Sequence, residues 1–348
     1  MKYIFTSKPE FEEPIRVLFL CGTKYSKNED DKRVVLKSFL EQDSKNKVVI
    51  LEDYYDFSNK NNELLSYYSA NLFDLYHIEM LASIFSTKTF IIHDSFSTAG
   101  EICTFASNPN LRDKIVTIVP ERYSVEEEKL SSFISLAFWN RKNKLISNDI
   151  LRYYPVTKNI KISDYRSIYH TFFKNNVVPN TLQKEINNIL NITNDITKVC
   201  IYNSSLLSNN VKHNERTTTV HISFESFKNY MFSIFTVDEI RRKLHSCKKI
   251  YEIKNLFKNF FEETLQNTIL HHDGKCKTLK VILGYQIDLN LDDAISMMIF
   301  IMNSCGIIRI KKGNEDNNIS VSICKNSVAT TEVYSELLIT YDNKEWGE

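Results

Sequence analysis

The chain has 348 residues and a formal net charge of +1, from 44 Lys and Arg residues against 43 Asp and Glu residues. Hydrophobic residues make up 43% of the sequence, which is enough for packed cores, and the length suits two domains better than one. The near-zero net charge excludes a polyanion-binding protein of generally basic composition, so any nucleic-acid surface has to be local.

Cysteine usage and hydropathy bound the compartment. The seven cysteines are an odd number and are scattered without a CxxC pair, which is typical of reduced thiols. Residues 1–13 contain three glutamates and do not form a basic-then-apolar leader. The most apolar stretch, residues 294–308, is interrupted by polar residues and falls short of the about 20 apolar residues that a membrane span needs. We therefore expect a soluble, cytoplasmic protein without a membrane segment.

The first third of the chain alternates short apolar runs with helical patterns. The apolar runs predict buried strands at residues 15–21, 48–51, 89–92 and 115–119. The periodicity between them predicts helices at residues 29–42, 72–85 and about 101–107. This alternation is typical of an α/β domain with a parallel, Rossmann-like sheet covered on both faces. In such a sheet, ligands bind beyond the carboxyl ends of the strands.

The rest of the chain predicts a connecting region and a smaller C-terminal domain. Residues 203–214 are rich in Asn and Ser, and we interpret them as a loop. Helical periodicity is present at residues 250–270 and 292–304, and a hairpin is predicted at residues 307–310 and 319–324. Helices followed by a two-stranded wing suggest a mainly helical, winged-helix-like domain. The expected domains are residues 1–165 (α/β), 166–248 (connecting region) and 249–348 (winged-helix-like).

The segment from Asp94 to Lys114, DSFSTAGEICTFASNPNLRDK, holds the most informative motif. It follows an apolar strand and opens a helix, so Glu101 is expected near the first helical turn at the carboxyl edge of the sheet. The helix dipole stabilises an ionised carboxylate there. Such a carboxylate can attack, or electrostatically support, a sugar carbon whose base departs. Taken alone, Glu101 is more often a capping residue than a catalyst, because glutamate caps helices well.

Other polar and small residues are expected at the same edge of the sheet. Glu52, Asp53 and Asp94 follow predicted strands and are candidates to hold ribose hydroxyls or to protonate the leaving base. The ends of the strands and the loops after them supply small or hydrogen-bonding groups for a substrate, namely Cys21, Gly22, Thr23, Ser97 and Thr98. Each of these residues also has a purely structural explanation as a strand end, a turn or a cap. Their combination is more specific than any single member.

Two stretches resemble the nucleoside 2-deoxyribosyltransferase-like family, and more closely the toxin effectors of retron anti-phage systems that contain such a domain. Residues 17–23, VLFLCGT, resemble the family's first strand and its small-residue substrate loop. Residues 94–114 are similar to the family's acidic residue, short Ser/Gly/Thr loop, catalytic glutamate and small-residue helix. The resemblance extends over about residues 15–119. Cys103 departs from the family, which usually has glycine at this position, and this argues against transferase activity.

The resemblance implies a fold, a reaction and partners. Glu101 would be the catalytic carboxylate of an N-glycosidase, and Asp94 its upstream acidic residue. The protein would be a toxin restrained by a retron reverse transcriptase and its multicopy single-stranded DNA, in a complex that can be a higher-order oligomer. NAD is the expected substrate, since nicotinamide leaves as a neutral base and needs little proton donation. We expect neither a cofactor nor a metal site.

Two features lie outside this motif. His271, His272 and Asp273 with Cys276 lack the spacing of a metal site, and we interpret them as a solvated loop. Residues 241–280 contain ten Lys or Arg residues against four acids, a difference of +6. A solvated basic face is the usual explanation for such a run, but its overlap with the predicted winged helix favours a phosphate-binding surface. The predicted nucleic-acid-binding residues are Lys248, Lys249, Lys254, Lys258, Lys311 and Lys312.

Three functions compete at this point. The first is a toxin that hydrolyses the N-glycosidic bond of NAD or a related nucleotide. The second is a nucleotide-sensing, DNA-binding regulator without catalysis. The third is a nucleoside deoxyribosyltransferase. A carboxylate at Glu101 favours catalysis, because a phosphate sensor would avoid an anion beside its ligand.

Overall fold

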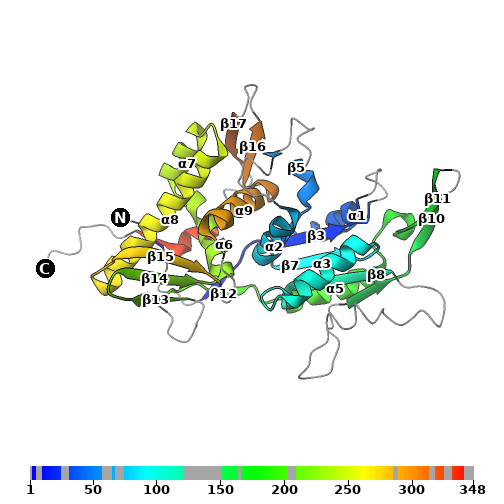
Figure 1. The fold of residues 1–348 in the computed structure, drawn as a ribbon, viewed down its shortest axis with the longest axis horizontal. Coiled ribbons are helices and arrows are strands. Elements are labelled where there is room, and N and C mark those ends of the chain that lie inside the picture. Colours follow the sequence, from blue (N-terminus) through cyan, green and yellow to red (C-terminus); the bar gives the residue numbers. More distant parts are fainter. Residues whose placement is uncertain are drawn as a thin grey trace, which may run out of the picture. The chain divides into compact units, whose positions relative to one another are not determined.

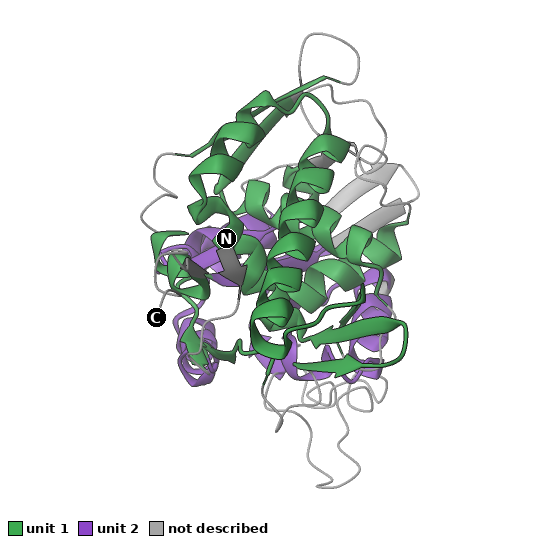
Figure 2. Ribbon diagram, turned by 90° about the vertical axis from the view of Figure 1, so that its left-hand side faces the viewer, with its two compact units in different colours: residues 1–15, 51–85, 195–348 green, residues 16–50, 86–194 purple. Residues whose placement is uncertain are grey.

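The computed structural model describes residues 2–4, 10–24, 31–56, 65–66, 74–120, 150–163, 166–202, 209–284, 289–312, 318–324 and 331–340. The chain forms two compact units that interleave in the sequence (Figure 2). Unit 1 comprises residues 1–15, 51–85 and 195–348, and unit 2 comprises residues 16–50 and 86–194. These boundaries differ from the three consecutive segments expected above, because residues 51–85 group with the C-terminal part of the chain and not with the sequence on either side of them.

Unit 2 is built on a five-stranded parallel sheet (Figure 1). Its strands, in spatial order, are β4 (Asn46–Val49), β3 (Arg16–Gly22), β7 (Lys88–Ile92), β8 (Ile115–Pro120) and β9 (Ile150–Tyr153). The four strands expected from apolar runs are confirmed, whereas β9 was not expected. The fold is therefore mixed α/β, with the parallel sheet that the sequence predicts.

The strand order of this sheet identifies where a ligand can enter. Numbered along the chain, the five strands lie in the order 2-1-3-4-5, so the order reverses between β3 and β7. Open α/β sheets of this order bind ligands beyond the carboxyl ends of the strands at that switch point. The register pairs Gly22 with Ile92, so Thr23 and His93 follow side by side at the switch point.

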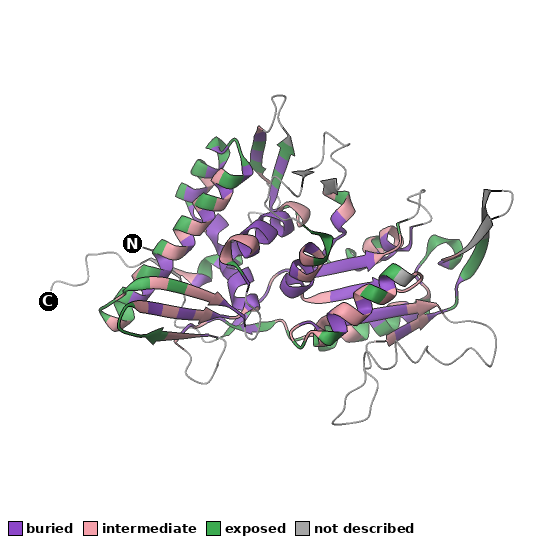
Figure 3. Ribbon diagram, in the orientation of Figure 1, coloured by how far each residue is buried: buried purple, intermediate pink, exposed green. Residues whose placement is uncertain are grey.

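Helices cover both faces of the sheet. The α1 helix (Lys32–Leu40) and the α5 helix (Asn180–Ile192) share one buried apolar cluster with alternate residues of all five strands. Leu182, Ile186 and Leu190 repeat every four residues, so α5 buries a single stripe against this cluster. The α3 helix (Phe96–Ser107) contacts β7 and β8. Right-handed crossovers in opposite directions put α1 and α3 on opposite faces, and the central strands are buried almost throughout (Figure 3).

An antiparallel ribbon follows β9 in unit 2. It consists of β10 (Val156–Ser163) and β11 (Arg166–Phe172), with Lys158 opposite His170 and Val156 opposite Phe172. A short 3-10 helix, η6 (Lys174–Asn176), leads from the ribbon to α5. A second one, η4 (Arg112–Lys114), precedes β8.

Unit 1 combines helices with small sheets. Its helices are α2 (Leu75–Phe85), α6 (Phe224–Ser233), α7 (Asp238–Ser246), α8 (Ile250–Asp273) and α9 (Leu291–Ser304). The α9 helix is its central core element, because all residues from Ala294 to Met302 are buried. The 3-10 helices are η2 (Leu51–Asp53), η7 (Ile234–Thr236) and η8 (Val333–Leu337).

Among its described residues, the strands of unit 1 form a mixed sheet and four two-stranded pairs. In the sheet, β14 (Thr217–Ile222) pairs antiparallel with β13 (Asn210–His213) and parallel with β15 (Thr278–Leu283). The pairs are β1 (Lys2–Ile4) with β18 (Leu338–Thr340), β2 (Glu10–Glu12) with β12 (Ile196–Lys198), β5 (Tyr55–Asp56) with β6 (Leu65–Ser66), and β16 (Ile308–Lys312) with β17 (Ile319–Ile323).

The C-terminal expectations are met in part. The predicted helices are α8 and α9, and the predicted hairpin is β16–β17. The described part of the C-terminal region does not show a winged-helix domain; the hairpin packs on α7 and α9 within the larger unit 1. Within the described ranges, no helix is long and apolar enough to cross a membrane.

Candidate functional site

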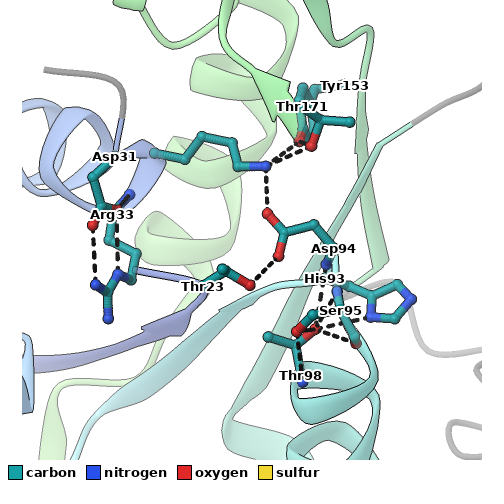
Figure 4. Close-up of polar contacts among 10 residues, drawn as sticks. Thr23, Asp31, Arg33, His93, Asp94, Ser95, Thr98, Tyr153 and Thr171 are labelled. Atoms are coloured by element: carbon teal, nitrogen blue, oxygen red, sulfur yellow. Dashed lines mark hydrogen bonds and ion pairs between the residues drawn. The ribbon is translucent and has the colours of Figure 1, made fainter. Parts of the chain in front are cut away.

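Asp94 lies at the centre of a polar cluster at the switch point of unit 2. It lies two residues after the end of β7, and its side chain is 6% exposed. The hydroxyl of Thr23, just beyond β3, donates to Asp94 Oδ1 over 2.6 Å (Figure 4). This bond spans the two strands between which the order reverses, so the sheet topology itself brings these two predicted residues together.

A buried lysine completes the cluster. Lys32 Nζ lies 2.6 Å from Asp94 Oδ2, and the lysine side chain is 2% exposed. The same ammonium donates to Thr171 Oγ1 over 2.6 Å and to Tyr153 OH over 3.1 Å. Burial raises the pKa of the Tyr153 phenol despite the nearby Lys32, so it remains a neutral hydroxyl. Lys32, Tyr153 and Thr171 could not be predicted as partners from the sequence, because no local pattern connects α1, β9 and β11.

An aspartate caps the start of α1, beside this cluster. Asp31 is the N-cap, and its Oδ1 accepts from the amide of Arg33 over 2.9 Å. The guanidinium of Arg33 also pairs with Asp31 Oδ2 over 3.0 Å, and both side chains are buried. A carboxylate already occupies the place that a helix N-terminus offers to an anion. We therefore do not assign a phosphate group to this helix end.

The start of α3 differs from the expectation. The helix begins at Phe96, after the N-cap Ser95, and not at about Glu101. Ser95 and Thr98 form a reciprocal capping box, and buried Thr98 accepts hydrogen bonds from the amides of Asp94 and Ser95. Thr98 therefore helps to form the start of the helix, while Ser97 is exposed. A capping box with threonine in place of Glu or Gln is a weak sequence signal.

Glu101 consequently lies in the second turn of α3. Glu101 is half-buried, and its Oε2 atom is shielded from solvent. The helix dipole therefore stabilises an ionised Glu101 less than the sequence predicts, because its effect fades beyond the first turn. Helical side chains tilt toward the N-terminus of their helix, and here that end meets the carboxyl edge of the sheet. The position therefore suits a carboxylate directed toward the edge where Asp94 lies.

His93 is a further titratable group at the end of β7. Its Nδ1 lies 3.2 Å from Thr98 Oγ1 (Figure 4). Burial lowers the pKa of His93 below its usual value of 6.5, and the charge of Asp94 only partly opposes this. The imidazole is therefore neutral near pH 7 and can both donate and accept a hydrogen bond. Its place after a predicted strand was visible in the sequence, but its contact with Thr98 was not.

The remaining predicted substrate residues are dispersed. Glu52 is half-buried and Asp53 exposed in η2, which belongs to unit 1, so the cluster described above contains neither. Cys21 is a buried residue of β3. Burial raises the pKa of the Cys103 thiol, which favours the neutral thiol over a nucleophilic thiolate.

Gly22 is required by the backbone between β3 and α1. Its φ is 155°, a value that side-chain-bearing residues rarely adopt. A Cβ atom added there would lie 3.3 Å from the Cγ and Cδ atoms of Arg33. Gly22 thus allows the chain to leave β3 close to the Arg33–Asp31 pair.

The predicted basic residues divide into distinct groups. Lys248 and Lys249 are exposed at the start of α8, and Lys254 is half-buried. Lys258 Nζ forms an ion pair with Asp292 Oδ1 at 3.0 Å, which reduces its availability to a phosphate. Lys311 is exposed on β16, whereas the side chain of Lys312 lies outside the described residues.

The hairpin joins this basic region at the start of α8. The amide of Ile319 donates to the Lys248 carbonyl over 2.7 Å. On β16, Arg309 and Lys311 are exposed while Ile308 and Ile310 are buried. Arg309 was not among the predicted residues, although the two-residue alternation of the strand places it on the same exposed face as Lys311.

The His271–Asp273 run is helical rather than a solvated loop. It forms the last turn of α8, which ends at Gly274 with φ 64°. Asp273 Oδ2 accepts from Tyr202 OH over 3.0 Å and lies 2.7 Å from His213 Nε2. Across the described ranges, no group of three or more His, Cys, Asp or Glu side chains is arranged to hold a metal ion.

Comparison with known proteins gives one family match. Residues 29–310 match the family described as STM3845 retron effector protein. No curated protein compared with the chain matches it. The family match spans Lys32, Asp94, Glu101 and Tyr153 as well as the basic region of α8. Because it covers more than half of the sequence, the chain belongs to the STM3845 retron effector protein family, which implies antiviral defence and association with retron components.

Proposed function

We propose that this retron effector is a toxin that hydrolyses an N-glycosidic bond, with NAD as its substrate and nicotinamide and ADP-ribose as its products. The observation that carries the proposal is the buried carboxylate of Asp94, held at the switch point by Thr23 and Lys32. Glu101 lies in the second turn of α3, and this helix begins at the same edge of the sheet. A pair of carboxylates at one ligand-binding edge is the arrangement that glycoside chemistry uses.

Asp94 is assigned to the sugar rather than to proton donation. An ionised carboxylate only accepts hydrogen bonds and has about four acceptor positions. The ion pair with Lys32 and the hydrogen bond from Thr23 use this acceptor character. Asp94 can accept ribose hydroxyls in the same way, so it would orient the sugar toward Glu101.

Glu101 is assigned to the anomeric carbon. Cleavage of the bond between C1′ and the base leaves positive charge on the ribose, which a carboxylate stabilises or captures covalently. Water then supplies the hydroxyl of the product, and its proton is released. Nicotinamide departs as a neutral base from a cationic nucleotide, so no strong acid is needed. The neutral imidazole of His93 suits this reaction better than it suits protonation of adenine.

We further propose that a reverse transcriptase and its multicopy single-stranded DNA restrain the toxin through the basic region around Lys248, Lys249 and Lys254. Phosphate contacts release counterions, so affinity should fall steeply as salt rises. Charge reversal of these three lysines to glutamate should weaken the complex and leave base release by the isolated chain unchanged. Binding measured across a salt titration checks this. An affinity that does not change with salt would exclude phosphate contacts and leave a protein–protein contact as the explanation.

The enzymatic proposal is tested with the purified chain. It is incubated separately with NAD, nucleosides and deoxynucleotides, and free base is measured by chromatography. Glu101→Gln keeps the shape of the side chain while removing its charge, so base release should fall by at least about a hundredfold. Glu185→Gln, the same change at an exposed position of α5, is the matched control and should retain activity. Tight nucleotide binding without release of any base would instead support the nucleotide-sensing regulator.

A further inference from the structure

Lys32 is placed where a lysine is electrostatically unfavourable. It is the first residue of α1, and the N-terminus of a helix carries partial positive charge. Its side chain is also almost completely buried. A buried lysine at this end of a helix is stable only if it is compensated by an anion and by acceptors for its hydrogens.

The charge and the hydrogens of this ammonium are compensated by the loop after β7 and by strands β9 and β11. An ammonium group has three hydrogens, and Lys32 Nζ has three oxygen acceptors within 3.1 Å, namely Asp94 Oδ2, Thr171 Oγ1 and Tyr153 OH. Tyr153 is itself fixed, since its ring packs on Phe173 with centroids 4.9 Å apart and its hydroxyl lies 3.2 Å from Thr171 Oγ1. The ammonium is thus held in one orientation.

From this geometry we propose that Lys32 is a positioning residue that acts through Asp94. Tyr153 and Thr171 hold the ammonium, the ammonium fixes Asp94 Oδ2, and Thr23 fixes Asp94 Oδ1. The carboxylate therefore faces the switch point in one rotamer, ready to accept ribose hydroxyls. The assignment of Asp94 to the ribose rests on the proposed function, whereas the coupling between Lys32 and Asp94 does not.

A double-mutant cycle tests this coupling. Lys32→Met, Asp94→Asn and the double variant are compared with the wild-type chain by kcat/KM for base release. A mispositioned substrate group can cost about a hundredfold in rate, and that loss is expected for Lys32→Met. If Lys32 acts through Asp94, the double variant should be no worse than Asp94→Asn, within about twofold. Lys32→Arg keeps the charge and should recover part of the loss.

The chain provides a matched control for the burial of a lysine. Lys228 pairs with Glu13 at 2.7 Å, with side chains 2% and 5% exposed, in unit 1. Lys228→Met should destabilise the protein and leave the kcat/KM of the folded fraction unchanged. Should Lys32→Met fail to fold, Tyr153→Phe keeps the packed ring and removes one acceptor; a several-fold loss that disappears in the Asp94→Asn background is expected.

The outcomes separate the two proposals. Losses that multiply in the double variant, or an Asp94→Asn chain that loses activity while Lys32→Met does not, would overturn the positioning role. If the wild-type chain releases no base, the proposed function fails. The toxicity of the same four proteins is then compared by the inducer dose that halves bacterial growth. If the double variant is no less toxic than Asp94→Asn, Lys32 and Asp94 are coupled. If the losses of toxicity of the two single variants multiply in the double variant, the coupling is refuted.

Discussion

At the scale of single residues, the candidate site is a set of buried charges that are each compensated nearby. Asp94 is compensated by Lys32, and Asp31 by Arg33. Removal of one member of a buried pair leaves an uncompensated charge, which usually costs more than the pair contributes. Such residues therefore tolerate little substitution, whether or not they contact a substrate.

His93 makes stability depend on pH. Its pKa is lowered in the folded protein, mainly by burial, so the unfolded chain binds the proton more readily. The unfolding free energy should therefore fall as the pH drops from 6.5 toward the lower pKa that His93 has in the folded protein. Urea unfolding at about pH 7.5 and about pH 5.5 should show this loss, and His93→Gln should reduce it. The pKa of His221 is also lowered, by burial and by nearby lysines, so His93→Gln should still lose part of its stability at the lower pH. An identical pH dependence in both proteins would contradict the account.

At the scale of elements, apolar runs predicted β3, β4, β7 and β8, and helical periodicity predicted that helices lie between them. Strand β9 was not predicted, because its four residues follow a long stretch without clear periodicity. The start of α3 was misplaced because its cap is made by Ser95 and Thr98 rather than by a glutamate. Asp94 and Thr23 were found because both follow predicted strands. Lys32 was not, because its partners come from distant elements.

Gly22 offers a test of the connection between β3 and α1. Gly22→Ala forces a side chain into a strained conformation beside Arg33, and should lower the unfolding free energy by about 1–3 kcal/mol. Gly100→Ala is the matched control, since an added Cβ there has no heavy atom within 4 Å and Gly100 lies inside α3. That substitution should stabilise the protein by about 0.5–1 kcal/mol. Equal effects in urea unfolding would show that the backbone at Gly22 is unstrained.

At the scale of the whole molecule, the sequence predicted the α/β class but not the interleaving of the two units. Residues 51–85 and 1–15 belong with the C-terminal part, and such long-range grouping has no local signature. Glu13 shows how the N-terminal segment is joined to unit 1. Its carboxylate accepts from Lys228 over 2.7 Å, from Asn229 over 3.0 Å and from Thr197. These three partners lie far from Glu13 in the sequence, so the ion pair between Glu13 and Lys228 could not be predicted.

Loss of Glu13 should therefore destabilise unit 1. Glu13→Ala leaves Lys228 buried without its anion, and the unfolding free energy should fall by about 3–5 kcal/mol. Replacement of both residues by methionine should recover a large part of that loss, because it removes both charges together. Glu10→Ala, an exposed change in β2, is the control. A double variant as unstable as Glu13→Ala would contradict this explanation.

We propose that this retron effector cleaves an N-glycosidic bond with Glu101, and this reaction can be tested in cells. The most direct measurement is mass spectrometry of metabolites from cells that express the chain without other retron components, compared with cells that express Glu101→Gln at the same level. We expect NAD to fall while nicotinamide and ADP-ribose rise in the first culture, and neither to change in the second. Growth arrest with stable NAD and no free base, or equal NAD loss with Glu101→Gln, would contradict the account.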